Sequence, residues 1–124
     1  MMGYVDQKPA CSGHYFVEEN GTAFINMACV YKEFRSCSYI QKLLSWAMIQ
    51  IVKDPNVKNK DEMFAEARLE MIPFWTKKRP DTFRTVGEKY MGENGHEQFR
   101  CAWKLPKLTD QWLIYFRLIL MLPF

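Results

Sequence analysis

An α/β fold is expected for this chain, because strand-like and helix-like patterns alternate along it. Residues 14–17 (His-Tyr-Phe-Val) favour a β-strand, and the Asn20-Gly21 pair that follows is a strong turn signal. Apolar residues then recur at helical spacing over two segments. Near the end, residues 112–120 form a continuous apolar run, which is typical of strands that are covered on both faces.

The composition indicates one small folded domain, residues 1–124. Hydrophobic residues make up 48% of the chain and aromatic residues 15%, which is too many for a disordered chain, and a net charge of +3 is too weak to indicate nucleic-acid binding. The N-terminus lacks the pattern of a secretory signal, so a cytoplasmic protein is expected. Residues 112–124 are 13 apolar-rich residues around Arg117, whereas a membrane span needs about 20, so no membrane partner is expected.

The cysteines and charged clusters predict no cofactor and no metal site. The chain has four cysteines, Cys11, Cys29, Cys37 and Cys101. They show no CxxC spacing and lie near no pair of histidines, so four reduced thiols are expected. His96 and the basic triplet 77–79 lie in polar segments, where such residues are usually solvated.

Two helices are expected in the first half of the chain. The first begins at Thr22, which can cap its first turn, and its apolar face consists of Phe24, Met27, Ala28, Tyr31 and Phe34. The second has the cleaner pattern, with apolar residues at positions 40, 43, 44, 47, 48 and 51. It ends at Asp54-Pro55, because the residue before a proline is pushed out of the α region.

The segment 54–100 is polar and is interrupted repeatedly by proline and glycine, so we expect it to be an insertion. A short helix over residues 61–71 would direct Phe64, Ala67 and Met71 inward. The expected order is therefore a strand, two helices, the insertion and a C-terminal strand.

Two separated segments resemble the small subunit of caspases. Residues 21–29 (Gly-Thr-Ala-Phe-Ile-Asn-Met-Ala-Cys) resemble its Gly-Ser-Trp-Phe-Ile-Gln signature, and residues 105–109 (Leu-Pro-Lys-Leu-Thr) are similar to the segment before the last strand of nematode cell-death caspases. The resemblance covers roughly residues 14–53 and 104–120. It implies a caspase-like α/β fold of which this chain holds the small-subunit portion only.

Departures from that pattern imply a non-catalytic homologue. Active caspases bind the substrate aspartate with a small-subunit arginine, and the corresponding segment here is Tyr15, Phe16 and Val17, with phenylalanine at the arginine position. The catalytic histidine and cysteine of the family lie in a large subunit that this chain lacks. Cys11 beside His14 resembles the catalytic motif only superficially, because polar residues precede it, so no catalytic residue and no enzyme are expected.

The function implied by the resemblance is association with a caspase zymogen or large subunit, which restrains autoactivation and so makes the chain a negative regulator of apoptosis. The apolar C-terminal strand would form the interface with that partner or with a second copy of the chain. The residues of this interface are Trp112, Leu113, Ile114, Tyr115, Phe116, Leu118 and Leu120. Two alternatives remain open: a small subunit that activates or completes a heteromeric caspase, and an unrelated small α/β adaptor.

Overall fold

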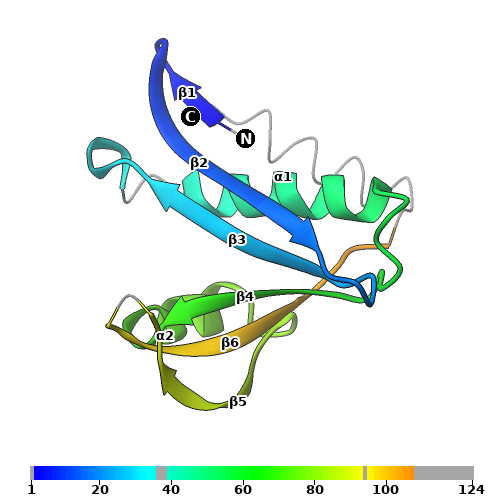
Figure 1. Ribbon diagram of the computed structural model, residues 1–124. Helices are drawn as coiled ribbons and strands as arrows, with labels where there is room; N and C mark the ends of the chain where they lie inside the picture. Colours follow the sequence, from blue (N-terminus) through cyan, green and yellow to red (C-terminus); the bar gives the residue numbers. More distant parts are fainter. Residues whose placement is uncertain (1, 36–38, 94, 108–124) are drawn as a thin grey trace.

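The computed structural model describes residues 2–35, 39–93 and 95–107, which form a six-stranded sheet and two helices (Figure 1). In chain order the elements are β1 Met2–Val5, β2 Lys8–Val17, β3 Ala23–Val30, α1 Tyr39–Lys53, β4 Glu62–Arg68, α2 Ile72–Lys78, β5 Phe83–Met91 and β6 Glu97–Lys104. Short 3-10 turns at Lys32–Phe34 and Leu69–Met71 follow β3 and β4. The strands lie in the order β1-β2-β3-β4-β6-β5.

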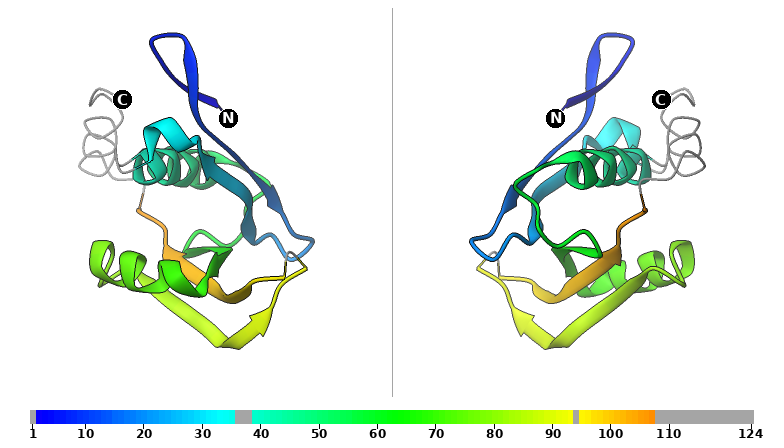
Figure 2. Two further views of the ribbon diagram at one scale, coloured as in Figure 1. Left: turned by 90° about the vertical axis from the view of Figure 1, so that its left-hand side faces the viewer. Right: turned by 90° about the vertical axis from the view of Figure 1, so that its right-hand side faces the viewer.

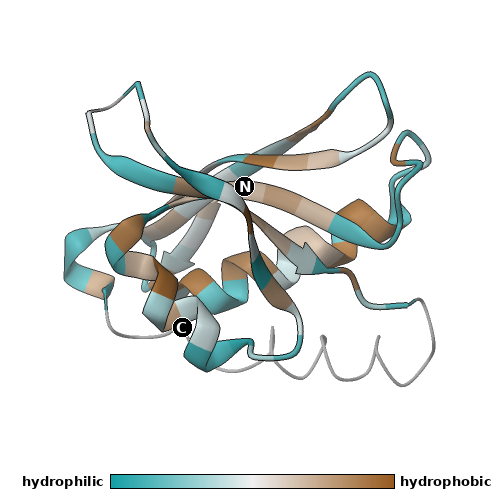
Figure 3. Ribbon diagram, turned by 90° about the horizontal axis from the view of Figure 1, so that it is seen from below, coloured by the Kyte–Doolittle hydropathy of each residue, from teal (hydrophilic) through white to brown (hydrophobic). Residues whose placement is uncertain are grey.

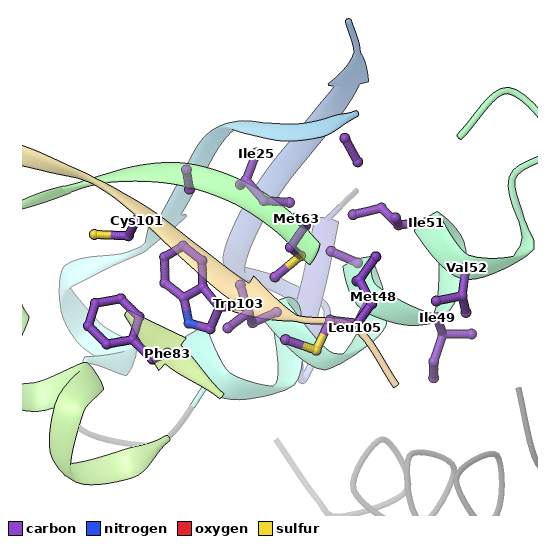
Figure 4. Close-up of a cluster of buried hydrophobic side chains, with 14 of the residues drawn as sticks. Ile25, Met48, Ile49, Ile51, Val52, Met63, Phe83, Cys101, Trp103 and Leu105 are labelled. Carbon is purple, nitrogen blue, oxygen red and sulfur yellow. The ribbon is translucent and has the colours of Figure 1, made fainter. Parts of the chain in front are cut away.

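Both helices cover the same face of the sheet (Figure 2), and seen from below they lie under it as a second layer (Figure 3). The main core lies between these layers. Ile25 of β3, Met48 of α1, Met63 of β4 and Trp103 of β6 belong to one buried cluster (Figure 4). No helix of the described residues covers the opposite face, which we call the open face of the sheet.

The hairpin of β2 and β3 confirms the predicted strand and the predicted turn. β2 ends at Val17, and the turn is fixed by Asn20, whose side-chain oxygen accepts a hydrogen bond from the Thr22 N–H at 3.0 Å. Gly21 has a φ of +82°, and a Cβ there would lie 2.5 Å from side-chain carbons of Lys58. The Gly21 carbonyl also accepts hydrogen bonds from the backbone N–H groups of Lys58 and Asn59, so this turn anchors the chain just before β4.

The helix predicted from Thr22 is wrong, because residues 23–30 form strand β3. Between the Gly13–Ala28 pair and the Tyr15–Ile25 pair, β2 advances two residues and β3 advances three. This β-bulge sets Phe24 and Met27, which are three residues apart in the predicted helical face, opposite Phe16 and His14, which are only two residues apart on β2. A three-residue spacing imitates one turn of a helix, which explains the misleading periodicity.

Helix α1 confirms the second predicted helix. Leu43, Leu44, Met48 and Ile51 are buried, and the helix ends at Lys53, just before Asp54-Pro55. The Lys60 ammonium closes this end by donating to the carbonyls of residues 51, 52 and 54 at 3.3, 3.1 and 2.7 Å. A cation at a helix C-terminus satisfies unpaired carbonyls and complements the helix dipole.

Residues 54–100, expected to be an insertion, are an integral part of the sheet. The short helix predicted over 61–71 is wrong, since β4 occupies residues 62–68 with Met63, Ala65 and Ala67 buried in alternation. Strands β5 and β6 pair with each other, and β6 pairs with β4. On the helix side of β6, the Trp103 ring packs against Trp75 of α2 at a centroid distance of 5.6 Å.

The last predicted strand, residues 112–120, lies outside the described residues. Three cysteines, Cys11, Cys29 and Cys101, are free thiols, as expected for the part of the chain that the structure covers. Burial is the largest cause that raises the pKa of the Cys101 thiol, to about 11. None of the helices described is long and apolar enough to cross a membrane.

Candidate functional site

Strands β3 and β4 are parallel neighbours that separate soon after they meet. Their only register pairs are Phe24 with Phe64 and Ile25 with Ala65. Beyond these pairs, residues 26–30 of β3 and 66–68 of β4 have no pairing with each other, and Figure 1 shows the two strands diverging toward their ends. We call this region the strand split. Helix α1 connects the two strands, and in such β-α-β units ligands bind at the carboxyl ends of the strands, where neighbours diverge.

The backbone of β3 presents hydrogen-bonding groups to the strand split. The Tyr31 N–H donates to the Ala10 carbonyl at 2.8 Å, so residue 31 faces β2. Successive residues of an edge direct their N–H and C=O groups to alternate sides. Ala28 and Val30 therefore face away from β2 and toward the split, and the Val30 carbonyl accepts a hydrogen bond from Arg35 Nε at 3.2 Å.

The β-bulge lies where the pairing of β3 with β4 ends. Asn26 is the extra residue, placed directly after Ile25, the last residue of β3 that pairs with β4. Bulges commonly terminate pairing and redirect a side chain beside active sites. Here the redirected side chain reaches β2, because Asn26 Nδ2 lies 2.9 Å from Nε2 of His14. Both residues are exposed.

A second polar group lies across the strand split, on the β4 side. Glu66 directly follows the last residue of β4 that pairs with β3, and its carboxylate accepts a hydrogen bond from Gln98 Nε2 at 2.6 Å. Tyr90 of β5 hydrogen-bonds to both of these side chains, and burial is the largest cause that raises the pKa of its hydroxyl. Gln98 is buried, so its position is fixed. Its hydrogen bond and that of Tyr90 therefore hold the Glu66 carboxylate in a network.

The closed end of the strand split is covered on the open face by an arginine between two aromatic rings. The Arg100 guanidinium carbon lies 5.1 Å from the ring centroids of both Phe24 and Phe64, the residues of the first β3–β4 pair. Its Nη2 atom lies 3.5 Å from a Glu18 carboxylate oxygen. Phe16 of β2 extends this surface, with its ring centroid 5.4 Å from that of Phe24.

Two cations and one carboxylate, that of Glu33, lie at the far end of the split. Lys32 and Arg35 lie between the end of β3 and the start of α1, and both are exposed. The N-terminal end of a 15-residue helix carries partial positive charge, which favours anions. The segment between β3 and α1 contains no glycine, because the chain has none between Gly21 and Gly87.

A cavity also lies under α1, but it is too small for a cofactor. Its volume is about 20 Å³, and it is lined by residues that include Gly13, Ile25, Ala28 and Leu43. A space of this size holds about one water molecule. The described residues contain no group of histidine, cysteine and acidic side chains that could hold a metal ion. The strand split is therefore the stronger candidate for a ligand site.

The three residues assigned to a degenerate substrate pocket lie side by side on β2. Tyr15 donates to an Asp54 carboxylate oxygen at 2.9 Å, Phe16 is exposed on the open face, and Val17 packs against the core. They therefore point to different surroundings, as alternation along a strand requires. The seven residues of the predicted partner interface, from Trp112 to Leu120, lie outside the described residues.

Comparison with solved structures identifies the fold. A proposed N-acetyltransferase from Lactobacillus plantarum is 14% identical over 82% of this chain and 64% of its own, with a TM-score of 0.66. The ribosomal-protein-S18-alanine N-acetyltransferase from Escherichia coli is 13% identical over 86% and 68%, with a TM-score of 0.63. A Bacillus subtilis acetyltransferase in complex with CoA is 12% identical over 85% and 75%, with a TM-score of 0.62. No family model and no curated protein matches the sequence.

The chain thus has the GNAT fold, the fold of these N-acetyltransferases, and it spans less than two thirds of the Lactobacillus protein. The caspase resemblance is wrong, because the solved structures named above, which share this arrangement, are acetyltransferases and not caspases. The expectations built on it, a caspase zymogen or large subunit as partner, restraint of apoptosis and the absence of enzyme activity, are overturned by the same comparison. Two short sequence matches are weaker evidence for a fold than the strand order of the whole sheet.

Proposed function

We propose that this chain binds a coenzyme A thioester at the strand split and is part of an enzyme that transfers the acyl group, acetyl above all, to an amine. The observation that carries the proposal is the parallel β3–β4 pair that opens after Ile25, so that the backbone groups of Ala28 and Val30 facing the split have no partner strand among the described residues. Similarity to a Bacillus subtilis acetyltransferase in complex with CoA supports the choice of cofactor. At 12% identity, that similarity concerns the fold, so the activity remains our proposal.

The residues at the strand split fit the parts of coenzyme A. Its pantetheine arm contains amide groups, which can pair with a free strand edge as an added β-strand does. The edge at exposed Ala28 and half-buried Val30 offers such pairing, and a ligand amide at Val30 would replace the Arg35 side chain on the Val30 carbonyl. Its phosphates carry negative charge, and Lys32 and Arg35 precede the N-terminal end of α1 at the far end of the same edge.

The phosphate end of this site would depend on side chains. In glycine-rich phosphate loops, backbone N–H groups approach the ligand closely because no Cβ intervenes. Residues 31–38 (Tyr-Lys-Glu-Phe-Arg-Ser-Cys-Ser) contain no glycine. Lys32 and Arg35 would therefore supply much of the attraction as charged groups, which makes binding sensitive to salt.

Acetyl-CoA, when bound, supplies an acyl group activated as a thioester. The chain's own contribution is to place the reacting end near the bulge, between Asn26 on one strand and Glu66 on the other. The Phe24–Phe64 pair and Arg100 close the sheet beyond that point, so solvent can reach the thioester from fewer directions. Fixing both reactants in one geometry is itself a large source of rate enhancement.

Calorimetric titration of the full chain with CoA tests the proposal. We expect saturable binding that weakens as the NaCl concentration rises. Ala28→Pro removes an N–H that faces the split, and an edge strand tolerates proline where the N–H points outward. Its matched control, Ala28→Val, keeps that N–H. Loss of one hydrogen bond predicts roughly tenfold weaker binding for the proline variant alone.

The transfer itself is measured as release of the CoA thiol from acetyl-CoA in the presence of amines. A suitable panel contains a peptide with a free N-terminus, a lysine-containing peptide with a blocked N-terminus, a polyamine and an aminoglycoside. Amine-dependent thiol release with any of them supports an acyltransferase. Absence of CoA binding by the wild-type chain would reject the proposed site.

A further inference from the structure

We infer that His14, held in place by Asn26, is the general base that accepts the proton of the acceptor amine. The inference rests on the proposed function and adds the residue that activates the acceptor. It starts from the contact between Nε2 of His14 and the side-chain amide of Asn26, at 2.9 Å. Neither residue belongs to the buried core, so the contact has no packing role there.

The position of this pair follows from the bulge. Asn26 is the residue at which β3 leaves β4, so its backbone lies at the closed end of the strand split, and its side chain extends from there to His14 of β2. The proposed thioester would lie at the same level of β3. His14 belongs to β2, the neighbouring strand, and reaches the bulge through Asn26. A base at this place would meet an amine that approaches the thioester across β3.

The chemistry of the pair suits proton transfer. Imidazole is the side chain used most often as a general base. The Asn26 amide has a donor on Nδ2 and an acceptor on Oδ1. When the Asn26 amide group is rotated by 180°, its Oδ1 accepts a hydrogen bond from the Nε2–H of His14. In that tautomer Nδ1 of the ring carries no hydrogen and can accept a proton. After the transfer, the same amide oxygen still accepts from Nε2 of the charged ring.

Glu66 is the other candidate base at the strand split, and its surroundings favour a structural role. Its carboxylate already accepts a hydrogen bond from Gln98 at 2.6 Å and one from Tyr90. These bonds hold the carboxylate against side chains of β6 and β5 and occupy it as an acceptor. His96, the chain's second histidine, follows the glycine-containing turn between β5 and β6 and belongs to neither β3 nor β4.

In the proposed step, the lone pair of the amine nitrogen forms a bond to the carbonyl carbon of the thioester. The C–S bond then breaks, and its electron pair leaves with sulfur as the thiolate. The amine proton passes to Nδ1 of His14 and is released later to solvent or to the thiolate. The step needs no oxidant, reductant or further reactant.

Chemical footprinting tests the location of His14 without any acceptor substrate. Diethyl pyrocarbonate modifies exposed histidines, and mass spectrometry of peptides measures each site separately. We expect saturating acetyl-CoA to slow the modification of His14 several-fold and to leave His96 unchanged, so His96 is the internal control. Equal rates with and without acetyl-CoA at His14, in a chain that binds CoA, would overturn the inference while the proposed function stands.

Kinetics of variants test the role. We expect His14→Gln to keep the CoA affinity within about twofold and to lower kcat by roughly 100-fold or more. Asn26→Asp places a carboxylate beside the ring, which favours the imidazolium and moves the acidic limb of the pH–rate profile to higher pH. Glu66→Gln tests the competing base, and the acidic limb of the profile should persist in this variant.

A His14→Gln variant with wild-type kcat would overturn the role of His14. The same follows if Glu66→Gln alone abolishes the acidic limb. A wild-type chain that binds no CoA would fail the earlier calorimetric test and would overturn both proposals together. These results are therefore distinguishable.

Discussion

The hydrogen bond between Tyr15 and Asp54 links the second strand of the sheet to the end of α1. The phenol donates to the carboxylate at 2.9 Å. Burial is the first cause that raises the pKa of Tyr15 to about 12, followed by the hydrogen bond to Asp54. On the other side, the Asn56 N–H and then the Tyr15 hydroxyl lower the pKa of the Asp54 carboxyl. The protonated phenol and the ionised carboxylate thus stabilise each other.

This bond predicts a specific pH dependence. The pKa of Tyr15 is higher in the folded state than in the unfolded chain, where tyrosine titrates near 10. Its contribution to stability is therefore complete below pH 10 and is lost as the pH rises toward 12. We expect Tyr15→Phe to lower the free energy of unfolding by about 1 to 2 kcal/mol at pH 7, measured with urea. That difference should shrink above pH 10.

Tyr31→Phe is the control for this measurement, because Tyr31 is exposed on the chain that follows β3. It should change the unfolding free energy by less than about 0.5 kcal/mol. A difference between wild type and Tyr15→Phe that stayed constant from pH 7 to 11.5 would show that Tyr15 titrates as an ordinary tyrosine.

At the scale of elements, the sequence predicts α1 well and the strands around the strand split poorly. Helix α1 keeps one period over fifteen residues, so its pattern is unambiguous. β3 has eight residues, and its bulge at Asn26 sets Phe24 and Met27, three residues apart, opposite Phe16 and His14, two residues apart on β2. Hydrophobic periodicity in the sequence does not reveal a bulge, because the extra residue is defined only by the pairing of β3 with β2. The bulge at Asn26 therefore marks the candidate site and also explains why β3 was predicted to be a helix.

Removing the bulge tests what it does for β3. Deleting Asn26 joins Ile25 directly to residue 27 and leaves the pairs on either side of the bulge in regular succession. We expect the deletion variant to fold, with a regular β2–β3 ladder, and to bind CoA at least tenfold more weakly, because β3 would then stay closer to β4. Calorimetry gives the affinity, and hydrogen exchange at residues 27–30 gives the pairing.

Asn26→Ala is the matched variant, since it removes the side chain and keeps the bulge. It should bind CoA as the wild type does. If the deletion variant also keeps wild-type affinity, the bulge has no part in forming the binding edge, and the strand split would owe its shape to α1 and the Gly21 turn instead.

For the whole molecule, the candidate site could not be located from the sequence, because its residues come from separate strands. His14, Asn26 and Glu66 stand on β2, β3 and β4, and no motif spacing connects them. The sequence showed that His14 was one of two histidines, yet only the sheet order brings it to Asn26. Residues 54–100, which were expected to be an insertion, contain β4 and so supply one side of the strand split. Because the prediction treated them as separate from the sheet, it left out that half of the site.

The same sheet order raises a question of cooperativity. The halves β1-β2-β3 and β4-β6-β5 share only two backbone pairs among the described residues, so side-chain packing must couple them. Met48 of α1 is 2% exposed and shares its buried cluster with Ile25 of one half and Met63 of the other. Met48→Ala should therefore cost about 2 to 5 kcal/mol of unfolding free energy, and both halves should still unfold together.

Urea unfolding followed by far-UV circular dichroism and by tryptophan fluorescence measures both effects in one experiment. Met91→Ala is the control, because Met91 is 64% exposed at the end of β5 and should cost less than about 0.5 kcal/mol. Coincident transitions in wild type and in Met48→Ala would mean that the core under α1 holds the diverging strands as one unit. Separate transitions in the wild type would instead mean that the two halves fold independently, and a ligand bound between them would then be expected to merge the transitions, since it binds only when both are folded.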